Sequence, residues 1–118
     1  MLAPPPCVPI GRCINVPSET CAAATGEAPH FCWESLPQAT DYTIIVEEVG
    51  PPRRAIWSWT FTYQNSGTAI LGAEYGRSCG GTATVAEKLV PGRAYQWGVA
   101  ARVDGQVFAL GGPFDFIP

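Results

Sequence analysis

The chain has 118 residues, 47% of them apolar and only 14% charged, with a net charge of −3. This length fits one domain with a real core, and the apolar content excludes a disordered chain. The acidic balance and the scattered arginines argue against nucleic acid as a partner. No apolar run approaches the ~20 residues of a membrane-crossing helix, so we expect no membrane span.

The first 29 residues differ in composition from the rest. They hold six of the twelve prolines and three of the five cysteines, and they contain no periodic apolar run. Proline fixes its own φ and lacks an amide donor, so this stretch suits neither a regular helix nor a central strand. We therefore predict an irregular N-terminal arm over residues 1–29 and a folded domain over residues 30–118.

Within residues 30–118, short β-type runs alternate with turn residues. Asp104-Gly105 is a strong hairpin signal, because a type I′ turn needs positive φ at both central positions. The stretch 72–81 is rich in glycine and is predicted to be a loop. The pattern predicts an all-β sandwich of about seven strands. The expected runs are 30–34, 41–49, 55–64, 68–71, 82–88, 94–103, and a last strand interrupted at Gly111-Gly112, made of 106–110 and 113–117.

Alternation within the runs assigns their faces. Near the C-terminus, Tyr95, Trp97 and Val99 share one face with further apolar residues, and we expect that face to be core. The positions between them are smaller or polar. In the first run, Trp33 is expected to face the core and Cys32 to face away from it.

Two stretches of the sequence resemble fibronectin type III domains, especially bacterial ones. Residues 31–34 and 36–46 are similar to the B strand, turn and C strand of that family. The stretch 89–101 resembles its E–F corner and F strand, with Leu89, Pro91, Gly92 and Tyr95 in the Leu-x-Pro-Gly-x-x-Tyr pattern. The resemblance implies an immunoglobulin-like sandwich in which the Tyr95 hydroxyl bonds to backbone just upstream and Trp33 is a buried B-strand tryptophan. It implies almost nothing about activity.

Five cysteines in a short chain favour disulfides over free buried thiols or a metal site. No Cys-x-x-Cys pair is present, and zinc sites normally contain one. Disulfides in turn indicate an extracytoplasmic location: secreted, cell-surface or periplasmic. If Cys32 faces outward, an arm cysteine is its expected partner, so that a bridge pins the arm to the sandwich; the odd count leaves one thiol over. The candidates are Cys7, Cys13, Cys21, Cys32 and Cys79.

Catalysis finds little support in the sequence. The single histidine, His30, has no nucleophile motif around it. Glu47 and Glu48 are adjacent on a strand, so they face opposite ways and cannot work as a carboxylate pair. The Gly80-Gly81 pair lacks the lysine and helix of a phosphate loop. We expect no catalytic site, no cofactor and no metal.

The stretch 57–63 places four aromatic residues on one face of one strand. One interpretation is that this ladder is a core face, which its small polar companions favour. The other is an exposed platform for a protein or a sugar, because the other aromatic residues already supply a large core. The candidate binding residues are Trp57, Trp59, Phe61 and Tyr63.

Two functional hypotheses follow from these features. The first is a non-catalytic structural or protein-interaction module, a subunit of a larger assembly or filament, whose arm adds a strand to a neighbour's open sheet edge. The low charge and the proline-rich arm favour it. The alternative is a carbohydrate-binding module that uses the aromatic ladder as a stacking platform.

Overall fold

The computed structural model describes residues 29–64, 66–67, 70–78 and 80–118. In this part the chain is all β, with seven strands in two antiparallel sheets and no helix. The predicted arm therefore lies outside the described residues, apart from Pro29. The strands are β1 (His30–Glu34), β2 (Asp41–Glu48), β3 (Arg54–Thr62), β4 (Ile70–Glu74), β5 (Thr82–Ala83), β6 (Tyr95–Val103) and β7 (Gln106–Phe116).

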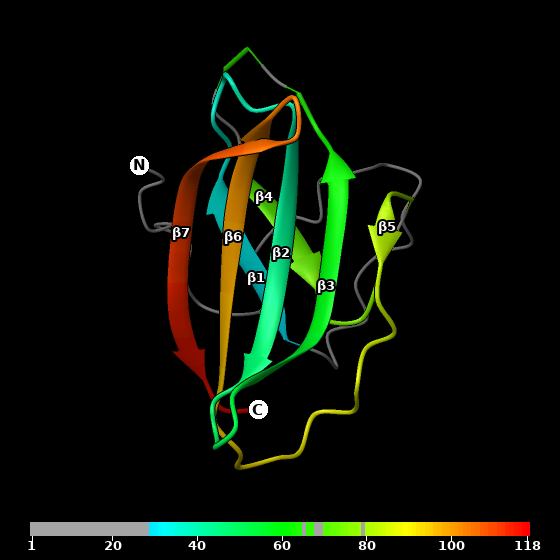
Figure 1. The fold of residues 1–118 in the computed structure, drawn as a ribbon, viewed down its shortest axis with the longest axis vertical. Coiled ribbons are helices and arrows are strands. Elements are labelled where there is room, and N and C mark those ends of the chain that lie inside the picture. Colours follow the sequence, from blue (N-terminus) through cyan, green and yellow to red (C-terminus); the bar gives the residue numbers. More distant parts are fainter. Residues whose placement is uncertain (1–28, 65, 68–69, 79) are drawn as a thin grey trace.

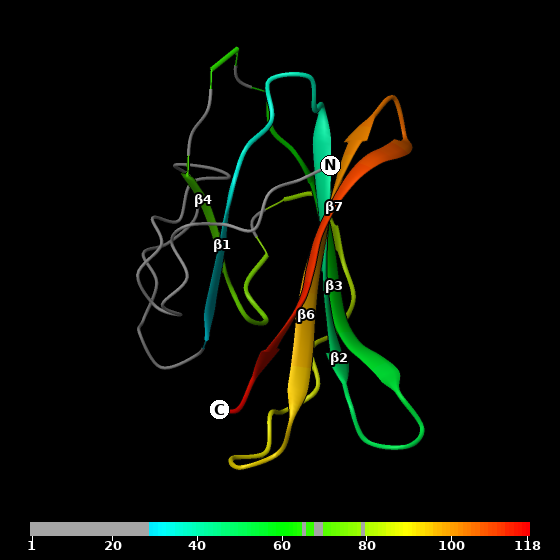
Figure 2. The ribbon, with the colours of Figure 1, turned by 90° about the vertical axis from the view of Figure 1, so that its left-hand side faces the viewer.

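The two sheets form two layers. The larger sheet has the order β5-β3-β2-β6-β7, and the smaller one pairs β1 with β4 (Figure 1). Seen from the side, β1 and β4 stand apart from the larger sheet, with the core between the layers (Figure 2). This arrangement is the β-sandwich that the sequence predicts.

Apolar side chains from both sheets fill the space between the layers. Phe31 and Trp33 come from β1, and their rings contact Trp97, with centroids 5.1 and 6.5 Å away. Trp33 and Tyr95 are buried as expected, and Leu89 packs half-buried against this core. The alternation of large and small residues along β6 therefore correctly predicts which face of this strand points into the core.

Two tyrosines fix the connections that enter strands of the larger sheet, β5–β6 at Tyr95 and β1–β2 at Tyr42. The Val90 amide donates a hydrogen bond to the Tyr95 hydroxyl at 2.8 Å, which confirms the expected bond to backbone just upstream. The Leu36 amide donates to the Tyr42 hydroxyl, also at 2.8 Å. The second bond occupies the β1–β2 connection and was not anticipated from the sequence.

The predicted hairpin turn is confirmed. Asp104 has φ 51° and Gly105 has φ 81°, so both central residues adopt the positive φ that a type I′ turn requires. Aspartate tolerates this conformation better than most residues because its short side chain can bond locally.

Three of the expected strand limits were wrong. β4 continues to Glu74, into the expected loop, because Gly72 pairs with Cys32 of β1. β5 ends at Ala83, because beyond it the chain follows β3 through separate hydrogen bonds rather than a continuous ladder. β7 runs unbroken across Gly111-Gly112, since an irregularity in its pairing with β6 absorbs the glycines.

Candidate interaction surface

The aromatic ladder of β3 belongs to the core. Trp57 and Trp59 are each 1% exposed and Phe61 is 4% exposed. The Trp59 indole donates a hydrogen bond to the Gly80 carbonyl at 2.9 Å, so its polar atom is also used internally. Tyr63, just past the strand, is half-buried against the same core. Of the two interpretations of this ladder, the core face is therefore correct and the exposed stacking platform is wrong: among the described residues, β1 and β4 face this side of the larger sheet and cover these rings.

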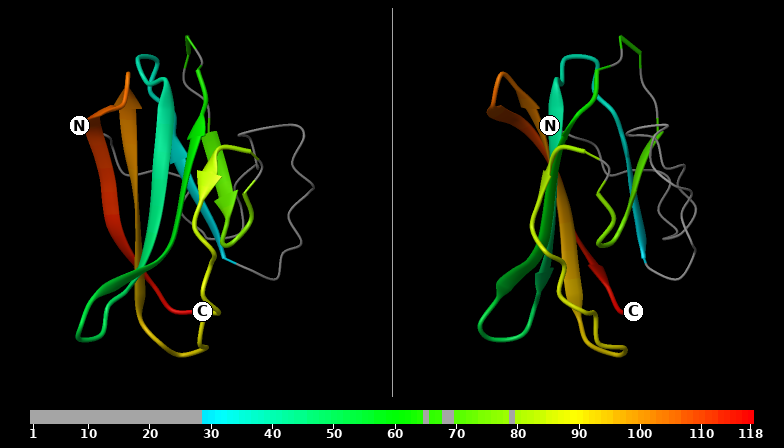
Figure 3. Two further views of the ribbon diagram at one scale, coloured as in Figure 1. Left: turned by 45° about the vertical axis from the view of Figure 1, so that its right-hand side comes forward. Right: turned by 90° about the vertical axis from the view of Figure 1, so that its right-hand side faces the viewer.

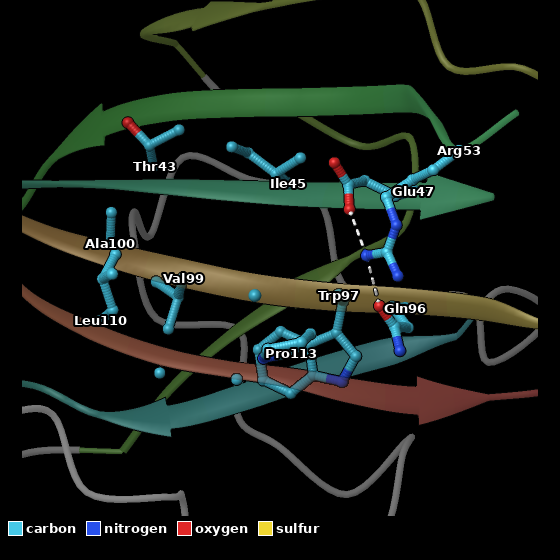
Figure 4. A pocket seen from close by; sticks show the side chains of 13 residues that line it. Thr43, Ile45, Glu47, Arg53, Gln96, Trp97, Val99, Ala100, Leu110 and Pro113 are labelled. Carbon is cyan, nitrogen blue, oxygen red and sulfur yellow. Dashed lines mark hydrogen bonds and ion pairs between the residues drawn. The ribbon is translucent and has the colours of Figure 1, made fainter. Parts of the chain in front are cut away.

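The opposite face of the larger sheet carries an open groove of about 430 Å³. Its side chains come from β2, β6, β7 and the turn before β3 (Figure 4). Ile45 and Leu110 give it exposed apolar walls, and Pro113 lies at the β7 side. The groove therefore lies on the face that points away from β1 and β4.

Missing side chains create the hollow. Ile45 of β2 lies opposite Gly98 of β6, so nothing stands beside it on that neighbouring strand. On the far side of Gly98, β7 presents Gly111 and Gly112. A Cβ on Gly98 would approach the Gly111 carbonyl oxygen at 3.1 Å, which is tighter than ordinary contact. The two strands thus come close here because they carry glycine.

A charged network closes one end of the groove. Nη1 of Arg53 donates to Glu47 Oε1 at 3.2 Å and to Gln96 Oε1 at 2.7 Å (Figure 4). The Gln96 amide in turn donates to Asp115 at 2.7 Å. The Arg53 side chain is half exposed. Its guanidinium is therefore oriented by hydrogen bonds within the chain and is also accessible to a partner in solvent.

The other end of the groove is polar as well. The Thr43 hydroxyl bonds to that of Thr60 at 2.8 Å and accepts a hydrogen bond from Arg102 at 3.2 Å. Arg102 also forms an ion pair with Asp41 at 3.1 Å. The apolar centre of the face is therefore framed by charged and hydroxyl groups that already have partners within the chain.

Exposed apolar residues continue from the groove along β7. Val107 is 54% exposed, Phe108 43% and Leu110 60%, so three of the seven large apolar side chains found exposed in the described residues belong to this strand. With Ile45, they form what we call the β7 surface: Ile45, Val107, Phe108 and Leu110. The sequence signals for it are present, namely the adjacent pair Ile44-Ile45, which forces one isoleucine outward, and the small residues of β6 facing it.

The cysteines are only partly described. Cys32 lies on the face of β1 opposite Trp33, as expected, yet it is only 2% exposed. It does not carry a free thiol. Cys7, Cys13, Cys21 and Cys79 lie outside the described residues, and so do any bridges between them.

Histidine, cysteine and carboxylate side chains do not cluster at one place in the described part of the chain. Among these residues no group of three or more His, Cys, Asp or Glu side chains is arranged to hold a metal ion. Glu47 and Glu48 each form ion pairs with arginines, at 3.2 Å to Arg53 and 2.7 Å to Arg93. No helix within the described ranges is long and apolar enough to cross a membrane.

Comparisons with known proteins return no relatives: no family model matches the chain, and neither a curated protein nor a solved structure matches it.

Proposed function

We propose that this chain is a non-catalytic protein-interaction module that binds its partner through the outer face of the larger sheet. The observation that carries the proposal is the β7 surface, where Ile45 and Leu110 stand exposed at the groove and Val107 and Phe108 are exposed farther along β7. Single exposed apolar residues need no explanation, whereas a contiguous group rimmed by polar residues marks interaction sites.

The layout of this face resembles that of known interfaces. Protein interfaces have an apolar centre depleted in charge and a polar, solvent-accessible rim. Here the centre is formed by Ile45, Gly98 and Leu110, and the rim contains the Arg53 and Arg102 networks. The partner that fits is a protein segment that places an apolar side chain in the groove and a carboxylate or amide beside Arg53.

Two further features belong to this proposal. The Tyr95 hydrogen bond and the strand order support the proposed likeness in fold to fibronectin type III domains, which by itself assigns no activity. The buried position of the outward-facing Cys32, which is not free, supports a disulfide to a cysteine outside the described residues and hence an extracytoplasmic location.

Site-specific photo-crosslinking tests the role of this face in the cells that make the protein. A photoreactive residue is placed at Ile45, and as a control at Val85, which is 92% exposed but lies next to the β3 edge. We expect one defined protein adduct from position 45 that disappears when Leu110→Lys is added, and none from position 85. Adducts with polysaccharide, or equal yields from both positions, would contradict the proposal.

The disulfide is tested separately. Peptide mapping under non-reducing conditions is expected to find Cys32 linked to another cysteine of the chain, with at least one thiol open to alkylation because the count is odd. Free alkylation of all five cysteines would exclude the bridge without affecting the β7 surface.

A further inference from the structure

The two edges of the larger sheet differ in how far other segments of the chain cover their strands. At the β3 edge, β5 pairs with Trp59 and Thr60, and the following segment adds hydrogen bonds from Thr84 to Ser58 and from Glu87 to Ile56 (Figure 3). A bidentate contact between Arg54 and Glu87 holds that segment in place. This edge is therefore covered along most of its length.

At the other edge, β7 pairs with β6 on one side only, as far as the described residues show. Its second half carries Pro113, which has no amide to donate, and this discourages pairing with another strand there. The first half, 106–110, contains no charge, no proline and no glycine. An exposed, uncharged edge strand of this kind is a template for strand pairing.

The hairpin tip also exposes this half of the strand. The end of β6 and the beginning of β7 bend away from β1 and β4 (Figure 2). A shift in register between Ala101 and Arg102 places an extra residue, Phe108, in β7 at this point. As a result Phe108 remains 43% exposed although the neighbouring Ala109 is buried.

We infer that residues 106–110 pair with the same residues of a second copy, antiparallel and across a twofold axis. This inference rests on the proposed interaction role and names the partner of the β7 part of the surface. A second copy fits because the segment is self-complementary: it is apolar on both sides of the axis and places no like charges opposite each other. Val107 and Leu110 of the two copies then cover one another.

The geometry limits both the size and the strength of this association. Pairing of β7 with β7 across a twofold axis uses the same edge of both copies, so this contact closes at a dimer instead of extending into a filament. Five residues per copy make a small contact compared with the roughly 800 Å² per partner of a standard interface. We therefore expect a dissociation constant in the micromolar range or weaker.

Sedimentation velocity over a range of concentrations tests the inference, on the wild type and three variants. Val107→Lys puts a charge on the edge without touching the groove, Ile45→Lys changes the groove without touching the edge, and Val85→Lys is an exposed control. We expect reversible dimers of the wild type, at least tenfold weaker dimerisation of Val107→Lys, and unchanged dimerisation of Val85→Lys. Hydrogen exchange of the wild type is expected to slow at the amides of 106–110 as concentration rises, which tests the pairing without a substitution.

Several results would overturn the inference: a wild type that stays monomeric, species larger than a dimer, a dimer lost on reduction, or Val107→Lys dimerising like the wild type. If Ile45→Lys alone prevents dimerisation, the copies meet through the groove; the strand pairing is then wrong although the outer face still binds protein. If dimerisation proceeds as expected but photo-crosslinking from Ile45 finds no protein, the strand pairing stands and the groove proposal fails.

Discussion

The Tyr95 hydroxyl accepts a hydrogen bond from the Val90 amide at 2.8 Å, five residues upstream. The Tyr95 ring meanwhile stacks on Phe116 of β7, with centroids 5.6 Å apart. One side chain thus anchors the connection that enters β6 and packs against the end of its neighbour. The contact between Tyr95 and Phe116 therefore helps to hold β7 in place, and β7 carries most of the β7 surface.

Replacing Tyr95 by Phe is expected to lower the free energy of unfolding by about 1–3 kcal/mol, because the Val90 amide loses its partner while the ring still packs. Urea unfolding followed by circular dichroism measures the change. Tyr95→Leu is the companion variant: it also removes the stacking on Phe116, so it should cost clearly more. Equal stability of wild type and Tyr95→Phe would show that the hydrogen bond contributes nothing.

The four tryptophans offer a test of where the aromatic ladder points. All of them are buried, the most exposed being Trp97 at 6%. We expect emission at short wavelength, weak quenching by acrylamide, and no change on addition of polysaccharides. Trp59→Ala should destabilise the fold by about 3–5 kcal/mol, as large deletions in a core do. A fluorescence shift that saturates with a polysaccharide would contradict the burial of the ladder.

Glycine is required at one point of β7. Gly112 has φ 96°, and a Cβ there would lie 2.8 Å from the Trp97 carbonyl oxygen. Gly112→Ala should therefore destabilise the protein by about 1–3 kcal/mol, because both the conformation and the space are unfavourable. Gly50→Ala is the matched control, since its Cβ would meet nothing within 4 Å and its φ is not positive. Thermal unfolding should therefore show a lower melting temperature for Gly112→Ala than for Gly50→Ala. Equal melting temperatures would mean that the backbone between β6 and β7 shifts at little cost to make room for the added Cβ.

Local patterns were sufficient to predict much of the fold. Alternation along β6 identified Trp97 as core, and the Asp104-Gly105 pair identified the hairpin, because both depend on neighbours in sequence. The β7 surface depends on which glycine of one strand lies beside which side chain of another. Ile45 is exposed beside Gly98, a pairing set by strand register, and register involves residues far apart in the chain. The ladder remained ambiguous for the same reason: its burial depends on β1 and β4 lying over it.

Alkaline pH provides a last test, through Tyr75. Its hydroxyl donates to the Glu87 carbonyl and its ring packs edge-on to Trp57. Burial first, and then the nearby Glu87 charge, raise the pKa of Tyr75 to about 12 from 10.0. Below pH 10 the folded and unfolded states both keep the proton, so the stabilisation is fully present.

Between pH 10 and 12 the unfolded chain loses the Tyr75 proton while the folded one retains it, so the free energy of unfolding should fall as pH rises. Urea unfolding at pH 9 and pH 11 measures this fall, which should be smaller in Tyr75→Phe because that variant has no proton to lose. The pKa of Tyr42 is raised as well, mainly by burial, so part of the fall should persist in the variant. A Tyr75→Phe protein with the same pH dependence as the wild type would mean that the phenol is open to solvent, and that the segment covering the β3 edge does not hold it.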